Sequence, residues 1–256
     1  VKATQGMVLV TGPTGSGKTT TLYATLDTVR DPALNIITIE DPVEYRLEGI
    51  RQTQVNPQAG VTFAAGLRAI VRQDPDVIMV GEIRDLETAQ MAVRASLTGH
   101  VVFSTLHTND APGAITRLLD IGVEPFLISS GVTGVLAQRL ARTVCRSCKE
   151  PYVPSEEVLE PFGIAERAKG RKFFRGRGCQ GCRFSGYRGR VGIYELLLVT
   201  DAIRDLINQG KSDTEIRKAA LKTGDLRGLY RDALEKAAKG VTTLEEISRI
   251  VHVKGE

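Results

Sequence analysis

A glycine-rich loop between an apolar run and a helix constrains this chain more than any other feature of its sequence. Residues 12–19 read GPTGSGKT and satisfy the pattern GxxxxGK[ST]. The run MVLV at residues 7–10 predicts a buried parallel strand before the loop, and TTLYATLDTVR predicts a helix after it. This strand–loop–helix context distinguishes a phosphate-binding loop from a chance glycine-rich turn. The sequence therefore predicts an α/β fold that holds a nucleotide phosphate.

The residue types in this loop suit phosphate binding. Glycines let backbone N–H groups converge on phosphate oxygens, and the following helix directs its positive end at the anion. We expect Lys18 to reach the β- and γ-phosphates and the Thr19 hydroxyl to ligate Mg²⁺. No guanine-reading NKxD segment is present, which favours ATP over GTP. The expected nucleotide-binding residues are Gly12, Pro13, Thr14, Gly15, Ser16, Gly17, Lys18, Thr19 and Thr20.

Acidic residues follow the second predicted strand, which lies within residues 35–47. An isoleucine-rich run is followed by Glu40, Asp41 and Glu44, and the intervening proline ends the strand. Ligands of α/β proteins bind at the carboxyl ends of parallel strands, so these carboxylates are expected at the nucleotide site. A solvated acidic turn is the alternative.

The third predicted strand, residues 76–85, departs from a common pattern. Many P-loop ATPases carry four apolar residues and then Asp-Glu at this position, whereas this chain has Gly81 and Glu82. Direct ligation of Mg²⁺ by an Asp of this strand is therefore in doubt, and water, Glu82 or Asp41 would complete the shell. Glu82 and Glu44 are both candidates for orienting or deprotonating the attacking water.

A fourth predicted strand, residues 100–110, contains the segment VVFSTLHTND. His107 follows its apolar part at the carboxyl end, beside the expected phosphate site. An isolated histidine is more often structural than catalytic. Because of its position, we expect His107 to sense the γ-phosphate or to contribute to the Mg²⁺ shell.

Four cysteines form two CxxC pairs, Cys145 with Cys148 and Cys179 with Cys182. Such pairs indicate a metal or a redox site. The redox alternative requires one CxxC at a helix start in a thioredoxin-like unit, and that context is absent. Two CxxC turns supply the four thiolates of a tetrahedral structural Zn²⁺ site. The sequence therefore predicts a tetracysteine zinc module.

The region around the second cysteine pair is basic. Between Arg167 and Arg190 lie nine basic residues and no acidic ones, with four aromatic residues interleaved. This pattern suits a nucleic-acid surface. A simpler interpretation is that the cations offset the net −2 charge of zinc with four thiolates. The remaining charge would then face an acidic membrane protein or anionic lipid.

The C-terminal part reads as a strand at residues 190–199 followed by helices. Capping residues mark the helix boundaries. Those expected to start helices are Asp201, Ser212 and Thr243 (with Glu246 completing a capping box), and those expected to end them are Gly224 and Gly240. We expect these helices to form one small bundle for packing and subunit contacts.

We therefore predict three parts: a RecA-like P-loop core at residues 1–143, the zinc module at 144–190, and a C-terminal strand with a helical bundle at 191–256. No run of 18 apolar residues is present, so no membrane-spanning segment is expected. The chain opens without Met, a few residues before its first strand, and we expect it to be a fragment.

Several long segments resemble the secretion ATPases of type II secretion and type IV pilus assembly. After the phosphate loop, ITIEDPVEY is similar to the acidic box of that family. GLRAIVRQDPDVIMVGEIRDLETAQMAVRASLTGH resembles its second nucleotide segment, including the Gly-Glu departure, and STLHTNDAPGAITRLLDIGVEPF resembles its His box. LAQRLARTVC and the strand RVGIYELLLV continue the match, so the resemblance covers most of the chain.

The resemblance implies a hexameric ring whose ATP cycle drives pseudopilin or pilin polymerisation. It also implies a cytoplasmic protein at the inner membrane, whose partners are a platform protein and accessory proteins. Assembly ATPases of the family commonly carry the tetracysteine module and retraction ATPases lack it, which favours secretion or extension. A preceding domain supplies arginines to the nucleotide site in the family, so we expect this chain alone to be weakly active.

Two other functions fit parts of the sequence. A DNA translocase or repair ATPase would use the basic zinc region, and steep stimulation by nucleic acid would support it. A non-motor module that uses ATP as a switch is disfavoured by Lys18, Thr19 and Glu82, which are the residue types that hydrolysis requires.

Overall fold

The computed structural model describes residues 5–251 and gives the backbone but not the side chain of Arg167. The ends of the predicted core and C-terminal part, residues 1–4 and 252–256, lie outside the described residues. The chain divides into two compact units. The first unit consists of Val1–Ala137 and Leu196–Leu226, and the second of Gln138–Glu195 and Arg227–Glu256.

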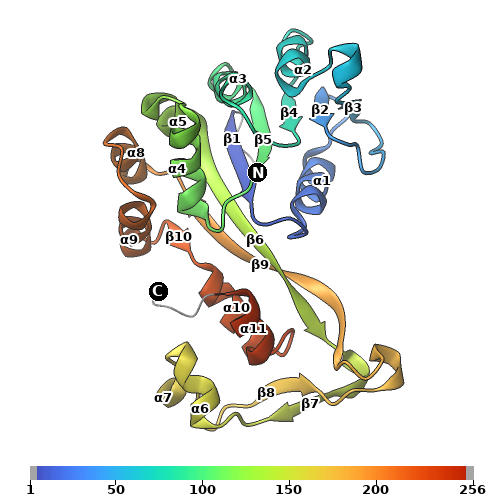
Figure 1. Cartoon of the computed structure of the whole chain (residues 1–256), viewed down its shortest axis with the longest axis vertical. Coiled ribbons are helices and arrows are strands. Elements are labelled where there is room, and N and C mark those ends of the chain that lie inside the picture. The colour runs from blue at the N-terminus through green and yellow to red at the C-terminus, as the bar shows by residue number, and fades with distance from the viewer. Residues whose placement is uncertain (1–4, 252–256) are drawn as a thin grey trace. The chain divides into compact units, whose positions relative to one another are not determined.

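The main sheet has eight strands in the order β10-β9-β6-β1-β5-β4-β2-β3 (Figure 1). β1 pairs in parallel with β5 and β6, and β2 pairs in parallel with β3 and β4, as β4 does with β5. The expected α/β fold is thus confirmed, with a mainly parallel sheet. The strands are β1 (Gly6–Thr11), β2 (Ile36–Glu40), β3 (Arg51–Gln54), β4 (Val77–Val80), β5 (Val101–Leu106), β6 (Val132–Val144), β9 (Tyr187–Leu198) and β10 (Leu226–Arg227).

The inner strands are buried on both faces because helices cover both sides of the sheet in the first unit. Side chains alternate along each strand: Met7 and Leu9 of β1 belong to one core and Val10 to the other. In β4, Ile78 and Met79 divide in the same way. Continuous Val/Ile/Leu-rich runs, such as VIMV, are what a doubly covered parallel sheet requires.

The helices of the first unit divide between these two cores. Leu22, Tyr23 and Leu26 of α1 fill one core, while apolar residues of the other long helices fill the opposite one. Asp85 and Asp110 cap α3 and α4 by accepting backbone N–H groups. The helices are α1 (Lys18–Val29), α2 (Phe63–Ile70), α3 (Leu86–Leu97), α4 (Ala111–Ile121), α5 (Pro125–Gly131), α8 (Asp201–Asn208), α9 (Asp213–Thr223) and a short 3-10 turn, η1 (Pro57–Ala59).

The second unit has its own apolar core and a small antiparallel pair, β7 (Lys149–Tyr152) with β8 (Phe173–Gly176). β6 and β9 contribute their residues 138–144 and 187–195 to this unit. Ile193, Phe173 and Leu244 are among the buried side chains of its core. Its helices and turns are η2 (Arg146–Cys148), α6 (Glu156–Leu159), η3 (Glu160–Phe162), α7 (Ala165–Ala168), η4 (Gln180–Cys182), α10 (Leu229–Ala238) and α11 (Leu244–Ile250).

The C-terminal helices do not form the single bundle that the sequence suggested. α8 and α9 contact each other and pack against α5 and α4 in the first unit, whereas α10 and α11 contact each other in the second. The buried apolar residues of α8 and α9 belong to the core of the first unit, and those of α10 and α11 belong to the core of the second. The compact units therefore divide the chain differently from the boundaries 143/144 and 190/191, which stay predictions as domain limits.

The helix caps agree with the sequence at some positions and differ at others. Ser212 starts α9 as expected and forms a capping box with Glu215, and Gly224 follows α9 with a φ of 82°. Thr200 rather than Asp201 is the N-cap of α8, so Asp201 lies in its first turn. Thr243 caps α11, but the Glu246 side chain binds Arg142 instead of completing the box.

Two smaller features complete the fold. Lys239 is the C-cap of α10, and Gly240 follows it, two residues after the last helical residue, Ala238. Among the described residues, no helix has the length and apolarity that a membrane crossing requires.

Candidate functional site

The phosphate loop connects β1 to α1 as the sequence predicted. Gly12, Gly15 and Gly17 have φ values of 147°, 76° and 88°, a region that side-chain-bearing residues avoid. The Ser16 amide donates a hydrogen bond of 3.2 Å to the Pro13 carbonyl. The loop therefore follows a path that its glycines make possible, and it ends at the N-terminus of α1.

Lys18 is the first residue of α1 and folds back over the loop. Its Nζ donates to the carbonyl oxygens of Gly12 at 2.8 Å and Pro13 at 3.3 Å. Burial lowers the pKa of the Lys18 amino group, and the negative charge of Glu82 partly opposes this effect. The ammonium group is thus held between the loop and the carboxylate that follows β4.

Glu82 lies at the carboxyl end of β4, and its side chain is 16% exposed. One carboxylate oxygen accepts a hydrogen bond of 2.5 Å from Arg84, and the other lies 3.6 Å from Nε2 of His107. Arg84 also lies 3.9 Å from the Asp41 carboxylate. Glu82 and His107, both expected at the site, are therefore neighbours, while the contribution of Arg84 was not foreseen.

Gly81 explains why this strand ends without the usual Asp. A Cβ at this position would lie 3.3 Å from both the Glu40 Cα and the Ile39 carbonyl oxygen. These are backbone atoms of β2 and cannot move aside like a flexible side chain. The close approach of β4 to β2 thus favours glycine here.

Glu44 and Asp41 lie in the loop after β2 and are exposed. The Glu44 amide donates a hydrogen bond of 3.3 Å to the hydroxyl of Tyr23 in α1. Tyr23 also donates to Glu40, the buried last residue of β2. Tyr23 was not predicted as a site residue, because a tyrosine in an apolar helix face indicates only core packing.

A cleft of 590 Å³ brings these groups together. It is bordered by the phosphate loop and by the ends of β2, β4 and β5. Gly12 and Pro13 are not among its lining residues, and their carbonyl groups accept hydrogen bonds from Lys18. The predicted site residues that line it are Thr14, Gly15, Ser16, Gly17, Lys18, Thr19, Thr20, Glu40, Asp41, Glu44, Glu82 and His107.

The loop geometry suits a nucleotide phosphate. A Cβ at Gly15 would meet no atom within 4 Å, so the loop backbone is open on that side. The Lys18 amino group and the N-terminus of α1 supply positive charge at the same place. Thr19 is exposed at the first turn of α1, where its hydroxyl is available to a metal bound with the phosphates. The residues present therefore fit ATP with Mg²⁺.

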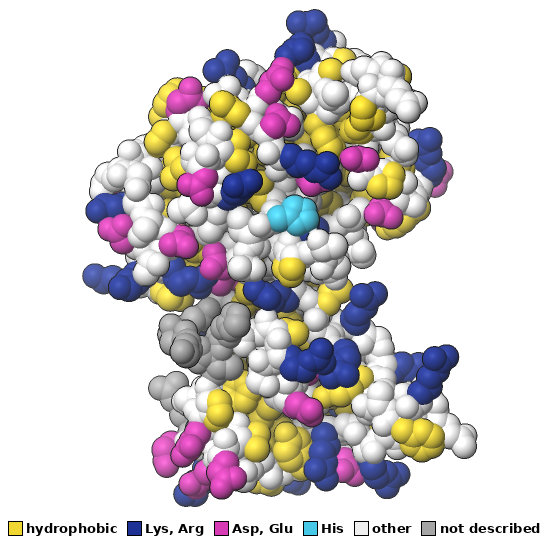
Figure 2. Space-filling model, in the orientation of Figure 1, with side chains coloured by type: hydrophobic (Ala, Val, Ile, Leu, Met, Phe, Trp, Pro, Cys, Tyr) yellow, Lys and Arg dark blue, Asp and Glu magenta, His cyan; other side chains and the backbone are white. Residues whose placement is uncertain are grey.

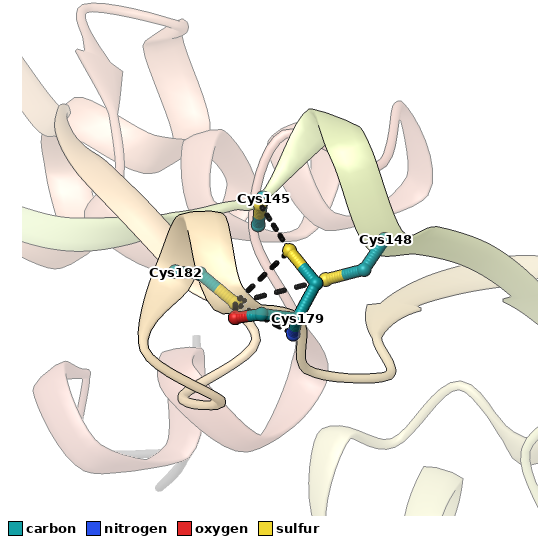
Figure 3. A group of neighbouring side chains, drawn as sticks. All are labelled: Cys145, Cys148, Cys179 and Cys182. Carbon is teal, nitrogen blue, oxygen red and sulfur yellow. Dashed lines mark hydrogen bonds between the residues drawn. The ribbon is translucent and has the colours of Figure 1, made fainter.

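The four cysteines converge in the second unit, with their sulfur atoms directed at one another (Figure 3). All four Sγ atoms lie within 4.8 Å of one another. Three separations are 3.9 Å (Cys145–Cys179), 3.8 Å (Cys148–Cys182) and 3.7 Å (Cys179–Cys182). A regular tetrahedron with Zn–S bonds of about 2.3 Å has S–S edges of about 3.8 Å. The cluster therefore has the dimensions of a zinc site.

Backbone groups further prepare this cluster for a metal. The amides of Cys179 and Gly186 donate to Sγ of Cys182 at 3.2 and 3.3 Å. Burial acts to raise the pKa of Cys182, but these donors outweigh it and lower the pKa to about 6. Burial raises the pKa of the Cys148 thiol to about 12. The thiols of Cys148 and Cys182 thus differ in pKa, and binding of a metal cation would deprotonate all four cysteines to thiolates.

The basic residues around the second cysteine pair are exposed. Lys and Arg side chains are spread over the visible face of the second unit (Figure 2). Two of them have acidic partners: Arg175 lies 3.0 Å from Glu150, and Lys169 lies 3.0 Å from Glu156. The exposed basic residues are Lys169, Arg171, Lys172, Arg175, Arg177, Arg183, Arg188 and Arg190, and the side chain of Arg167 is outside the described ones.

Comparisons with known proteins agree with these features. The family described as Type II/IV secretion system protein matches residues 1–249. Type II secretion system protein E of Dickeya dadantii (strain 3937) is 57% identical over 246 residues, which are 96% of this chain and 48% of that protein. The type IV pilus assembly ATPase PilB of Thermus thermophilus is 55% identical over 94% of this chain and 27% of its own length.

A solved structure shows the same fold. The pilus retraction motor PilT, crystallised with bound ADP, is 32% identical, with a TM-score of 0.71 over 96% of this chain and 61% of that one. The chain spans about half the length of the type II secretion relatives that it matches. Because the family match extends over nearly the whole chain, this protein belongs to the Type II/IV secretion system protein family.

Proposed function

We propose that this chain is the catalytic part of an ATPase motor that drives pseudopilus or pilus assembly. The observation that carries the proposal is the cleft in which the phosphate loop faces Glu82, Glu44 and His107. The names of the relatives support it, since they are a type II secretion protein and a type IV pilus assembly ATPase.

The residues of the cleft have distinct roles in this proposal. The loop amides and Lys18 bind the phosphates, and the Thr19 hydroxyl holds the metal. When bound there, Mg²⁺ would neutralise negative charge that develops on the phosphate oxygens. Either Glu82 or Glu44 orients or deprotonates the attacking water, and His107 senses the γ-phosphate through its neighbour Glu82.

We assign zinc to the four cysteines as a structural ion. The separations between the sulfur atoms support this assignment. The two CxxC turns support it too, because known structural zinc sites with four cysteines have the same spacing. With four thiolates the site carries a net charge of −2, which the exposed cations around it offset. This role requires no nucleic acid, and we propose none as a partner.

The assembly and its location follow from the family resemblance. We propose a homo-hexamer that works at the cytoplasmic side of the inner membrane with a platform protein and accessory proteins. Ring subunits would move relative to one another as they bind and release nucleotide. The weak activity expected of this chain alone stays a prediction.

The proposal is tested by ATP binding and hydrolysis in matched variants. Lys18→Ala should abolish nucleotide binding, because it removes the charge that reaches the phosphates. Replacing the base by glutamine should lower kcat by about 10²–10⁴-fold with little change in KM.

Glu82→Gln and Glu44→Gln are therefore compared with a control variant, Glu48→Gln. Glu48 is exposed and lies in the same loop as Glu44. A fall in kcat in one of the first two, with the Glu48 variant unchanged, identifies the base. Wild-type kinetics in both would contradict the assignment of either residue to the chemistry.

A further inference from the structure

A carboxylate that the proposed mechanism does not use is buried beside the nucleotide cleft. Glu40 ends β2 with 2% of its surface exposed, yet it lines the cleft. One oxygen accepts from the Tyr23 hydroxyl, and the other accepts from Thr38 Oγ1 at 2.5 Å and Gln52 Nε2 at 3.1 Å. A buried carboxylate requires hydrogen-bond donors, and Glu40 therefore holds the side chains of Tyr23, Thr38 and Gln52 in place.

Tyr23 connects this carboxylate to the loop that carries Glu44. It lies in α1, five residues after Lys18, and its side chain is fully buried. Its hydroxyl accepts from the Glu44 amide at 3.3 Å and from Gln52 Nε2 at 3.4 Å. The Tyr45 ring packs edge-on against it, with ring centroids 4.7 Å apart. One hydroxyl therefore joins α1, β2, β3 and the Glu44 loop.

The direction of each hydrogen bond is determined by chemistry. The Glu44 amide and the Gln52 NH₂ group can only donate, so the tyrosine proton is directed at Glu40. Burial first, and then the hydrogen bond and charge of Glu40, raise the pKa of Tyr23, which keeps this proton in place. The hydroxyl thus has one defined orientation.

Gln52 holds the next part of the same loop. It lies on β3 and donates through Nε2 to the Tyr45 carbonyl at 3.1 Å. Its Oε1 accepts from the Leu47 amide at 2.8 Å. Together Tyr23 and Gln52 bind three parts of the loop backbone, at Glu44, Tyr45 and Leu47.

The carboxylate of Glu44 is left available by this arrangement. Within residues 5–251 it makes no hydrogen bond or ion pair, and it borders the cleft. Glu82, in contrast, is engaged by Arg84 and approached by His107. The loop backbone is fixed, while the carboxylate that it carries can bind a water molecule.

We propose that Tyr23 and Gln52 are positioning residues that hold the Glu44 carboxylate at the nucleotide. Tyr23 and Lys18 share α1, so the phosphate loop and the Glu44 loop are attached to the same helix. The inference rests on the proposed ATPase function and makes Glu44 the base that these contacts serve.

Tyr23→Phe tests this role in the protein at the full length that its gene encodes. The substitution removes one oxygen and keeps the ring against Tyr45. We expect kcat to fall about 10- to 100-fold, because a misplaced base loses much of its effect. The KM for ATP and the binding of a fluorescent ATP analogue should stay within about twofold, since no phosphate contact is lost.

A double-mutant cycle with Glu44→Gln separates positioning from a general structural effect. When Glu44 can no longer act as a base, misplacing it has no further cost. Tyr23→Phe should therefore leave the single-turnover rate of the Glu44→Gln variant unchanged. An equal fall in both backgrounds would overturn the proposal.

Two further variants test whether the effect comes from the Glu44 loop or from Glu40. Thr38→Val removes another hydrogen bond of Glu40 without touching the Glu44 loop, and it should keep the wild-type kcat. Gln52→Met, on the edge strand, should lower kcat in the same direction as Tyr23→Phe, and it serves if the buried variant fails to fold.

The outcomes distinguish this inference from the function on which it rests. A wild-type protein without Mg²⁺-dependent hydrolysis would overturn both. Hydrolysis in the wild type with normal kcat in Tyr23→Phe and Gln52→Met would overturn the positioning role alone. A fall in kcat with Thr38→Val of the same size would also overturn it, since the effect would then follow Glu40 rather than the loop.

Discussion

Gly81 shows how a single residue departs from a familiar pattern for a geometric reason. It occupies the place of an Asp in many P-loop ATPases, but a Cβ there would lie only 3.3 Å from backbone atoms of β2, which is a tight contact. Acidic groups at the ends of β2 and β4 surround the position instead, with Asp41 and Glu82 near Arg84. Under the proposed function, the negative charge around a bound metal would therefore come from these neighbouring positions.

Gly81→Asp should accordingly destabilise the protein without strengthening the Mg²⁺ dependence of ATP hydrolysis. The new Cβ would lie 3.3 Å from backbone atoms of β2, and separating the strands should cost about 1–3 kcal/mol of unfolding free energy. Urea unfolding and Mg²⁺ titration of ATP hydrolysis measure the two effects. If the variant reached half-maximal activity at a lower Mg²⁺ concentration and kept its free energy of unfolding, this explanation would be contradicted.

At the level of elements, one ion pair attaches α11 to β6 within the second unit. Glu246 is 3% exposed and accepts from the Arg142 guanidinium at 2.6 and 2.8 Å and from the Arg142 amide at 3.1 Å. Burial acts to raise the pKa of Glu246, but these hydrogen bonds and the charges of Arg142 and Arg249 outweigh it and lower the pKa. The ionised form therefore stabilises the folded unit.

Glu246→Gln should lower the free energy of unfolding at pH 7 by about 1–2 kcal/mol, a reduced value because Arg142 is 40% exposed and screened by solvent. The folded-state pKa is depressed, so this stabilisation is present above the usual value of 4.5 and is lost as the pH falls through the lower folded value. Urea unfolding at several pH values should show the difference between wild type and variant narrowing below pH 4.5.

The exposed neighbour Glu245 provides the control for this experiment. Glu245→Gln makes the same chemical change one residue away and should leave the stability at pH 7 nearly unchanged. Equal losses in the two variants would mean that general surface charge, rather than the buried pair, stabilises the helix.

The two CxxC turns, which contain Cys145 with Cys148 and Cys179 with Cys182, allow a test of the proposed zinc site. Cys145→Ser should abolish zinc binding at the proposed four-cysteine site and lower the melting temperature, because a ligand of a closed site is lost. Elemental analysis and thermal unfolding measure both quantities. The control is Ser147→Ala, an exposed position between the cysteines of the same turn. Full zinc content in Cys145→Ser would exclude the proposed ligand set.

Elements that depend on local sequence were predictable, and those that depend on distant partners were not. The loop at residues 12–19, β1, β4 and β5 follow from apolar runs and glycine positions. The edge strand β3, RQTQ, has no apolar signal because it is half-exposed and held by β2. The division of the C-terminal helices depends on which core each apolar stripe meets, which a sequence does not record.

The candidate site shows the same limit. Glu82, Glu44 and His107 could be predicted because strand ends meet at one edge of a parallel sheet. The Tyr23–Glu40 contact could not, because tyrosine in an apolar helix face and glutamate at a strand end carry no mutual signal. Such pairs emerge only when the strand and helix are placed.

At the scale of the whole molecule, the two units carry different parts of the proposed function. The first contains the nucleotide cleft, and the second contains the four cysteines and most of the exposed basic residues around them. The net charge of +4 is small for a protein of 256 residues. A nucleic-acid motor would depend on that basic region, whereas a secretion motor would not.

The most direct test of the central claim is steady-state ATP hydrolysis by the full-length protein, with and without single- and double-stranded DNA, beside its Lys18→Ala variant. We predict Mg²⁺-dependent turnover that is indifferent to DNA and is lost in the variant. Strong stimulation by DNA that weakens steeply with salt would contradict the secretion-motor account and would favour a nucleic-acid translocase.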